Sequence, residues 1–103
     1  MPEKKKIRVV TLTIKAKRLL DEQDNVLLFK NSGRGKGRAP IMFPKKCMYN
    51  FSKVIVHFDT WKGRELFKAF KFDIPLWLYI AKQDNDIVFL GRDVIVDYTH
   101  DKY

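Results

Sequence analysis

The stretch from Ile7 to Lys17 constrains the fold more than any other part of the chain, because apolar and polar side chains alternate along it. Val10, Leu12 and Ile14 fall on one side, and threonines and lysines fall on the other. A period of two residues is typical of a strand that buries one of its faces. We therefore predict a strand here and a β-sheet around it.

Two further strands are predicted before residue 60. A polar run of turn-forming residues, 21–25, leads into the apolar residues 26–29, which should return as the second strand of a hairpin. Residues 53–59 alternate well enough to predict a third strand. The segment 41–51 stays unassigned, because Pro44 and two lysines interrupt its apolar residues.

A helix is predicted over residues 61–70. Asp59 or Thr60 would cap it, because a side-chain oxygen at that position accepts hydrogen bonds from the free amides of the first turn. Leu66 and Phe70 are four residues apart and would share one helical face. The helix would therefore be amphipathic.

Further strands are predicted after Pro75, which should stop the helix. Residues 76–82 form the first of them, and the apolar segments 87–90 and 94–96 follow a polar turn. The resulting order, β-β-β-α-β-β, resembles that of an OB-fold, a five-stranded barrel that often holds oligonucleotides. We therefore predict an α+β fold: a small, mostly antiparallel β-sheet or an OB-like barrel, with one short helix.

The chain length predicts a single domain over residues 1–103. The hydrophobic residues, 46% of the chain, are enough to form one packed core. Residues 31–40 should form a mobile basic loop, and both termini should be disordered over a short length. The lone Cys47 has no partner for a disulfide, and no apolar stretch reaches the roughly 20 residues needed to cross a bilayer. We expect a cytoplasmic protein.

The formal charge of +9 is unevenly distributed. Residues 1–46 hold 13 basic and 4 acidic side chains, whereas residues 73–103 hold 3 and 6. A one-sided positive surface attracts polyanions, and nucleic acid is the commonest of them in the cytoplasm. An acidic protein surface is the alternative partner, and no membrane partner is expected.

The sharpest signal is a segment in which glycines alternate with the cations Arg34, Lys36 and Arg38. The glycines let the backbone approach a phosphate strand, while every second residue supplies a charge. The spacing is not that of a nucleotide-binding loop, which needs Gly-Lys-Ser/Thr or a further glycine where Arg38 stands. We predict phosphate contacts here; the alternative is a solvated linker.

Four cations in and beside the predicted helix form a second candidate group. Arg64, Lys68 and Lys71 would line one helical face, with Lys62 nearby. Such a stripe contacts successive backbone phosphates and adds affinity without reading the base sequence. The alternative is an ordinary solvated face.

Two aromatic residues form a third candidate group. Trp77 and Tyr79 would share one face of the predicted strand 76–82, where bases of any sequence would stack on the rings. The alternative is a strand buried on both faces, with the two rings in the core.

Catalysis and cofactor binding have little support in the sequence. His57 and Asp59 would share one face of the predicted strand 53–59, but a surface His–Asp pair is more often structural than catalytic. One cysteine and two histidines offer no metal-ligand spacing. We expect no enzymatic activity, metal or cofactor.

The sequence thus predicts a non-catalytic protein that binds nucleic acid, with single-stranded DNA or RNA favoured. The alternative is a small interaction protein, of the kind viruses use, that inhibits or redirects a larger enzyme such as a polymerase or nuclease. Exposed edge strands leave pairing into a homodimer open.

Overall fold

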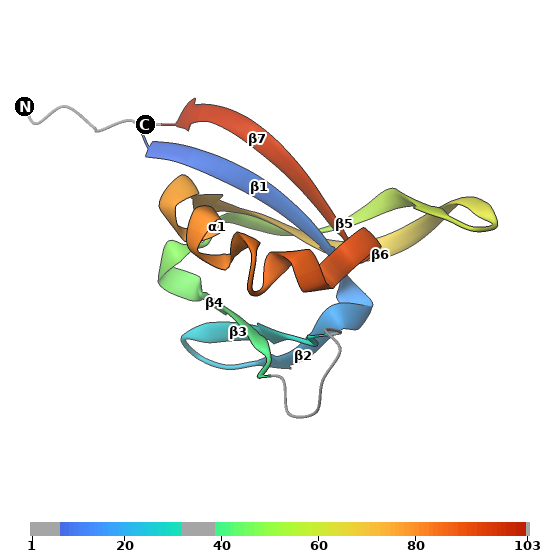
Figure 1. Ribbon diagram of the computed structural model, residues 1–103, viewed down its shortest axis with the longest axis horizontal. Helices are drawn as coiled ribbons and strands as arrows, with labels where there is room; N and C mark the ends of the chain where they lie inside the picture. The colour runs from blue at the N-terminus through green and yellow to red at the C-terminus, as the bar shows by residue number, and fades with distance from the viewer. Residues whose placement is uncertain (1–6, 32–38, 103) are drawn as a thin grey trace, which may run out of the picture.

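The computed structural model describes residues 7–31 and 39–102, with only the backbone described at residues 7 and 99–102. The predicted disordered N-terminus and most of the predicted mobile loop 31–40 lie outside these ranges. The described strands form two antiparallel sheets, one of four strands and one of three (Figure 1).

The predicted first strand is present as β1 (Ile7–Lys15), an inner strand of the larger sheet. The order in this sheet is β5-β6-β1-β7, with β5 at Tyr49–Thr60, β6 at Gly63–Pro75 and β7 at Val94–Lys102. All three pairings are antiparallel. The predicted strands at 53–59 and 94–96 are therefore confirmed, and both are longer than the sequence indicated.

The smaller sheet has the order β2-β3-β4. Its strands are β2 (Leu19–Glu22), β3 (Val26–Phe29) and β4 (Ile41–Pro44). The predicted strand at residues 26–29 is confirmed, but its hairpin partner is β2 rather than the predicted strand 7–17, and Asp21 and Glu22 of the predicted turn belong to β2. Two short 3-10 helices, η1 (Ala16–Arg18) and η2 (Lys45–Cys47), connect this sheet to β1 and to β5.

The hydrophobic core lies between the two sheets. β1 contributes Val10, Leu12 and Ile14, which are fully buried, as the alternation predicts. Phe43 of the smaller sheet meets Phe72 of the larger one edge to face, with 5.3 Å between the ring centroids. This arrangement sets the positive edge of one ring against the negative face of the other.

The helix α1 (Leu76–Gln83) and the 3-10 segment η3 (Ile87–Asp93) also pack on this core. Leu78 and Tyr79 of α1 and Leu90 of η3 are buried in it. Both elements lie between β6 and β7 in the sequence, so they precede the last strand of the larger sheet.

The predicted helix over residues 61–70 is wrong, because these residues form the turn after β5 and most of β6. β6 is hydrogen-bonded to β5 on one side and to β1 on the other. Phe70, Phe72 and Ile74 alternate with polar residues and are buried against the core. Pairing on both edges and this burial outweigh the helical spacing of a few apolar residues.

The predicted strands at 76–82 and 87–90 are also wrong, because these segments form α1 and η3. A short apolar run is compatible with a strand and with a buried helix, so its periodicity does not decide between them. Pro75 precedes α1 with a φ of −59°. Pro75 is the N-cap residue of α1, a place where no backbone N–H is needed for the helix, so here proline marks a start rather than an end.

The α+β class, with mostly antiparallel sheets and one α-helix, is confirmed for the described part of the chain. The two sheets stay separate, so the described strands do not close a barrel. The order is six strands, α1 and a seventh strand rather than β-β-β-α-β-β. Within the described ranges, no helix has the length and hydrophobicity to span a membrane.

Candidate nucleic-acid interface

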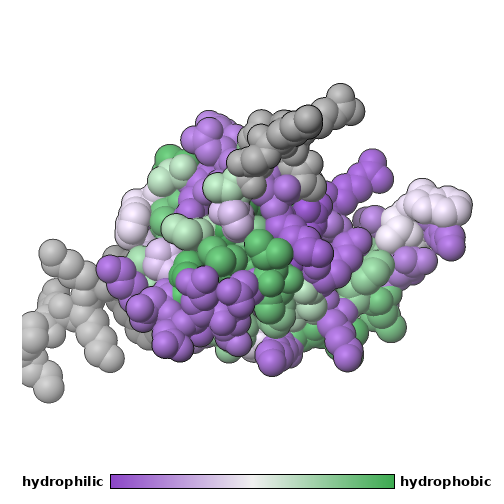
Figure 2. Space-filling model, turned by 90° about the horizontal axis from the view of Figure 1, so that it is seen from below, coloured by the Kyte–Doolittle hydropathy of each residue, from purple (hydrophilic) through white to green (hydrophobic). Residues whose placement is uncertain are grey.

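β5 and β6 continue as a two-stranded ribbon past the rest of the larger sheet (Figure 1). β1 pairs with β6 only between Ala69 and Pro75, whereas β5 pairs with β6 as far as Gly63. Among the described strands, residues 55–68 therefore pair only with each other, and we call this ribbon the arm. In the view of Figure 2 it extends to the right, with hydrophilic side chains along much of its length.

The outer face of the arm mixes cations with exposed apolar side chains. Lys68 lies opposite Ile55, and Leu66 lies two residues before Lys68 on the same face. Ile55 and Leu66 are 66% and 63% exposed. Arg64 Nε donates to Asp59 Oδ1 at 3.3 Å in an ion pair whose side chains are both exposed.

The inner face of the arm packs on the end of β1. Phe58 is buried there and meets Phe67 edge to face, with 5.9 Å between the ring centroids. Lys15 Nζ lies 3.8 Å from the centroid of the Phe67 ring and 4.9 Å from that of Phe58. Because a cation is attracted to the negative faces of aromatic rings, Lys15 fixes the arm on the sheet.

Lys15 is itself held by the half-buried carboxylate of Asp93. Its Nζ forms an ion pair with Asp93 Oδ1 at 3.1 Å, and Arg18 Nε donates to Asp93 Oδ2 at 2.6 Å. Burial alone would raise the pKa of the Asp93 carboxyl, but hydrogen bonds from Arg18 and Lys15 outweigh burial and lower this pKa below its usual value. Asp93 therefore stays charged and ties η1 and β1 to the start of β7.

The turn at the tip of the arm presents an indole ring to solvent. Thr60 Oγ1 donates to Gly63 O at 2.7 Å and accepts a bond from Lys62 N at 3.2 Å, which fixes the turn. Gly63 has a φ of +110°, a conformation that only glycine adopts without strain. Trp61 is 86% exposed, and Lys62 Nζ lies 5.1 Å from the centroid of its ring.

A depression of about 460 Å³ lies at the base of the arm. Lys53 and Lys68 contribute to its lining, together with apolar side chains that include Ala16, Ile55 and Phe70. Both lysines are exposed, and neither makes an ion pair with another described residue. Two neighbouring ammonium groups without a carboxylate favour an anion at this place.

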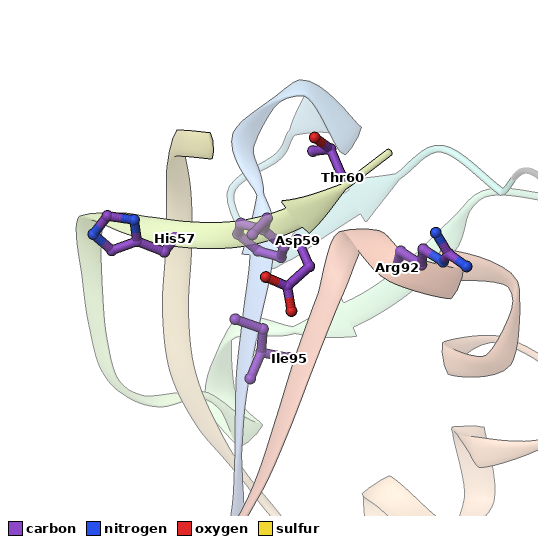
Figure 3. A pocket seen from close by; sticks show the side chains of 6 residues that line it. His57, Asp59, Thr60, Arg92 and Ile95 are labelled. Atoms are coloured by element: carbon purple, nitrogen blue, oxygen red, sulfur yellow. The ribbon is translucent and has the colours of Figure 1, made fainter. Parts of the chain in front are cut away.

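A second depression, of about 510 Å³, lies between the end of β5 and the start of β7 (Figure 3). His57 and Arg92 lie on opposite sides of Asp59 in this view, and the three side chains point in different directions. The Asp59 carboxylate is engaged by Arg64 rather than by His57. Within the described residues, no three His, Cys, Asp or Glu side chains gather as metal ligands would.

The structure brings together three of the four cations predicted as a helical stripe. Lys62, Arg64 and Lys68 all belong to the arm, and Arg64 and Lys68 share its outer face. Lys71 lies on β6 beyond the arm and points to the opposite face, because it is an odd number of residues from both. The predicted stripe along a helix is therefore wrong, although three of its four cations lie on the arm.

The Gly-rich segment with Arg34, Lys36 and Arg38 lies outside the described residues.

The predicted aromatic platform is wrong. Trp77 and Tyr79 are two residues apart on a helix and therefore face different directions. Trp77 is 64% exposed, whereas Tyr79 is 6% exposed and belongs to the core. The hydroxyl oxygens of Tyr98 and Tyr79 are 3.1 Å apart and share a hydrogen bond, and this bond together with burial raises the pKa of Tyr79 to about 12.

Trp61 and Lys53 are not among the site residues that the sequence predicts. The signal for them was the pair of residues that precedes Gly63, placed between two segments that read with a period of two. A short loop that contains a glycine, placed between such segments, indicates a hairpin. The predicted helix 61–70 concealed that pattern.

Comparisons of the chain with protein-family models, with curated proteins and with solved structures each found no match. Its function is therefore inferred from its own residues.

Proposed function

We propose that the protein binds nucleic acid without a catalytic step, and that the arm is its main contact. The observation that carries this proposal is the set of exposed cations along one ribbon: Lys53 and Lys68 at its base, and Lys62 at its tip. These side chains are long and strongly hydrated, and they suit phosphate oxygens as point charges.

A single strand of DNA or RNA is the favoured ligand. A basic groove that follows the backbone, combined with aromatic side chains that stack on bases, is the usual way in which proteins bind single strands. The depression at Lys53 and Lys68 supplies the first component, and Trp61 supplies an exposed ring on the same ribbon. A two-stranded ribbon also fits the major groove of duplex DNA, so duplex is the comparison ligand.

The proposal extends to residues that lie outside the arm. Arg34, Lys36 and Arg38 would add phosphate contacts from the Gly-rich segment, as the sequence predicts. We also propose a cytoplasmic location. A single cysteine cannot form a disulfide within the chain, so this protein does not depend on an oxidising compartment. This mode of binding does not depend on an OB-like barrel.

The test compares two charge-matched double variants. Lys53→Gln with Lys68→Gln should weaken binding to a labelled single strand roughly tenfold near 0.15 M salt, since two phosphate contacts are lost. Lys45→Gln with Lys46→Gln removes the same charge at η2, which precedes the start of β5, at the end away from the arm (Figure 1). Equal losses in both variants would show that only net charge matters and would contradict a specific role for the arm.

A second candidate function follows from Ile55 and Leu66, which stand exposed beside the cations of the arm. Apolar side chains ringed by charge are typical of protein interfaces, so the arm would also suit an acidic patch on a larger enzyme such as a polymerase or nuclease. A pull-down with and without nuclease treatment separates the two functions. Partners bridged by nucleic acid are lost on digestion, and direct protein partners stay.

A further inference from the structure

We infer that Trp61 is a base-stacking residue: its indole ring stacks on an unpaired base of the strand whose phosphates lie along the arm. This inference rests on the proposed function and adds to it the chemical group that the tip recognises. It also assigns the stacking role to a residue other than the predicted pair, Trp77 and Tyr79.

The exposure of Trp61 is the first observation. At 86% it is the highest value among the exposed large apolar side chains of the described residues. A ring of this size gains much from burial, and indole rings are usually kept at least partly covered. An indole held fully in solvent at the end of a ribbon is therefore suited to being covered by a ligand.

The rigidity of the turn is the second observation. Thr60 makes one hydrogen bond to the carbonyl of Gly63 and another from the amide of Lys62, so the backbone on both sides of Trp61 is fixed. A ring on a fixed turn loses little conformational freedom when it binds. The tip is thus pre-organised for a stacked ligand.

The neighbouring ammonium group is the third observation. Lys62 Nζ lies 5.1 Å from the centroid of the Trp61 ring. The tip therefore combines a flat aromatic face with a positive charge at short range. A nucleotide offers the complement of both, because it carries a base with a π face and a phosphate a few bonds away.

Trp77 provides a matched comparison within the same chain. It is also exposed, at 64%, but it lies on α1 next to the exposed apolar residue Ile80. The one lysine of α1, Lys82, is paired with Asp86. Among the described residues of α1, no unpaired lysine therefore stands beside this exposed indole, and Trp77 serves as an internal control.

The experiment uses the two tryptophans one at a time. Trp77→Phe leaves Trp61 as the sole tryptophan, and Trp61→Phe leaves Trp77. Titration with an oligothymidine of about 12 nucleotides, within the usual site size, should quench Trp61 fluorescence and shield it from acrylamide. The signal of Trp77 should not change. A change in Trp77 alone would overturn the inference.

Affinity measurements with an abasic strand of the same length separate stacking from phosphate binding. Trp61→Ala should weaken binding to oligothymidine by about 5- to 150-fold, the range for loss of one base–aromatic stack, and leave binding to the abasic strand unchanged. Trp61→Phe keeps a ring and should restore most of the loss. An equal loss for both strands would overturn the inference.

The outcomes also separate this inference from the proposed function. If Trp61→Ala binds oligothymidine as the wild type does while Lys53→Gln with Lys68→Gln weakens it, the stacking role is wrong and nucleic-acid binding stands. If the wild-type protein binds neither strand, both are wrong.

Discussion

The buried Lys15 forms an ion pair with the half-buried Asp93, with 3.1 Å between Nζ and Oδ1, that joins the end of β1 to the last residue of η3, next to β7. The same ammonium group lies against the rings of Phe58 and Phe67 on the inner face of the arm. One side chain therefore connects the core sheet, the last strand and the proposed binding element. The orientation of the arm depends on this contact.

Replacement of Asp93 by asparagine should lower the free energy of unfolding by about 3–5 kcal/mol, because it leaves the buried Lys15 charge without a counter-ion. Chemical denaturation at neutral pH measures the change. Glu22→Gln breaks the exposed pair between Glu22 and Lys45 and should change stability by only about 0–1 kcal/mol. A loss for Asp93→Asn as small as that of Glu22→Gln would contradict the structural role of the pair.

Stability should depend on pH through the same carboxylate. The folded protein lowers the pKa of Asp93, so the unfolded chain takes up this proton first as the pH falls. The contribution of Asp93 is fully present above its unfolded pKa of about 3.9 and is lost as the pH falls through the lower folded value. The difference in unfolding free energy between wild type and Asp93→Asn should therefore shrink below about pH 4. A difference that stays constant to pH 2 would contradict this account.

The hydroxyl group of Tyr79 should lose its proton only at high pH. Its hydrogen bond with Tyr98 and its burial raise its pKa to about 12, so its stabilising contribution is fully present below about pH 10 and is lost as the pH rises toward the folded value. Tyr79→Phe should remove this late step from an ultraviolet pH titration. The same variant should bind oligonucleotides as the wild type does, because Tyr79 belongs to the core and not to a platform.

Strands with a clear alternation of apolar and polar residues could be predicted more fully than the rest of the fold. The alternation in β1 and β5 could be read directly, because each strand places apolar residues on one face at every second position. β6 could not, since its central place in the sheet depends on pairing with β1 and β5, which are distant in the sequence. Local spacing that suits a helix carries no information about such partners.

The candidate site shows the same division. Lys62, Arg64 and Lys68 could be identified from charge alone, and all three lie on the arm. Their position relative to Lys53 and Trp61 depends on how β5 and β6 pair in the hairpin. This pairing could not be foreseen, because the sequence predicts a helix for residues 61–70. Trp77 and Tyr79 would share a face only in a strand, where every second side chain points the same way, and they lie in the helix α1.

The measurement that most directly tests the central claim is the salt dependence of binding to a single-stranded oligonucleotide. With about five phosphate contacts, the plot of log affinity against log salt for the wild type should have a slope of roughly −3.5. A triple arm variant, Lys53→Gln, Lys62→Gln and Lys68→Gln, should flatten this slope by about 2. The control variant, Lys30→Gln, Lys45→Gln and Lys46→Gln, should retain nearly the full slope. A wild-type affinity that does not respond to salt, or the same flattening in both triple variants, would contradict the assignment of the arm as the nucleic-acid contact.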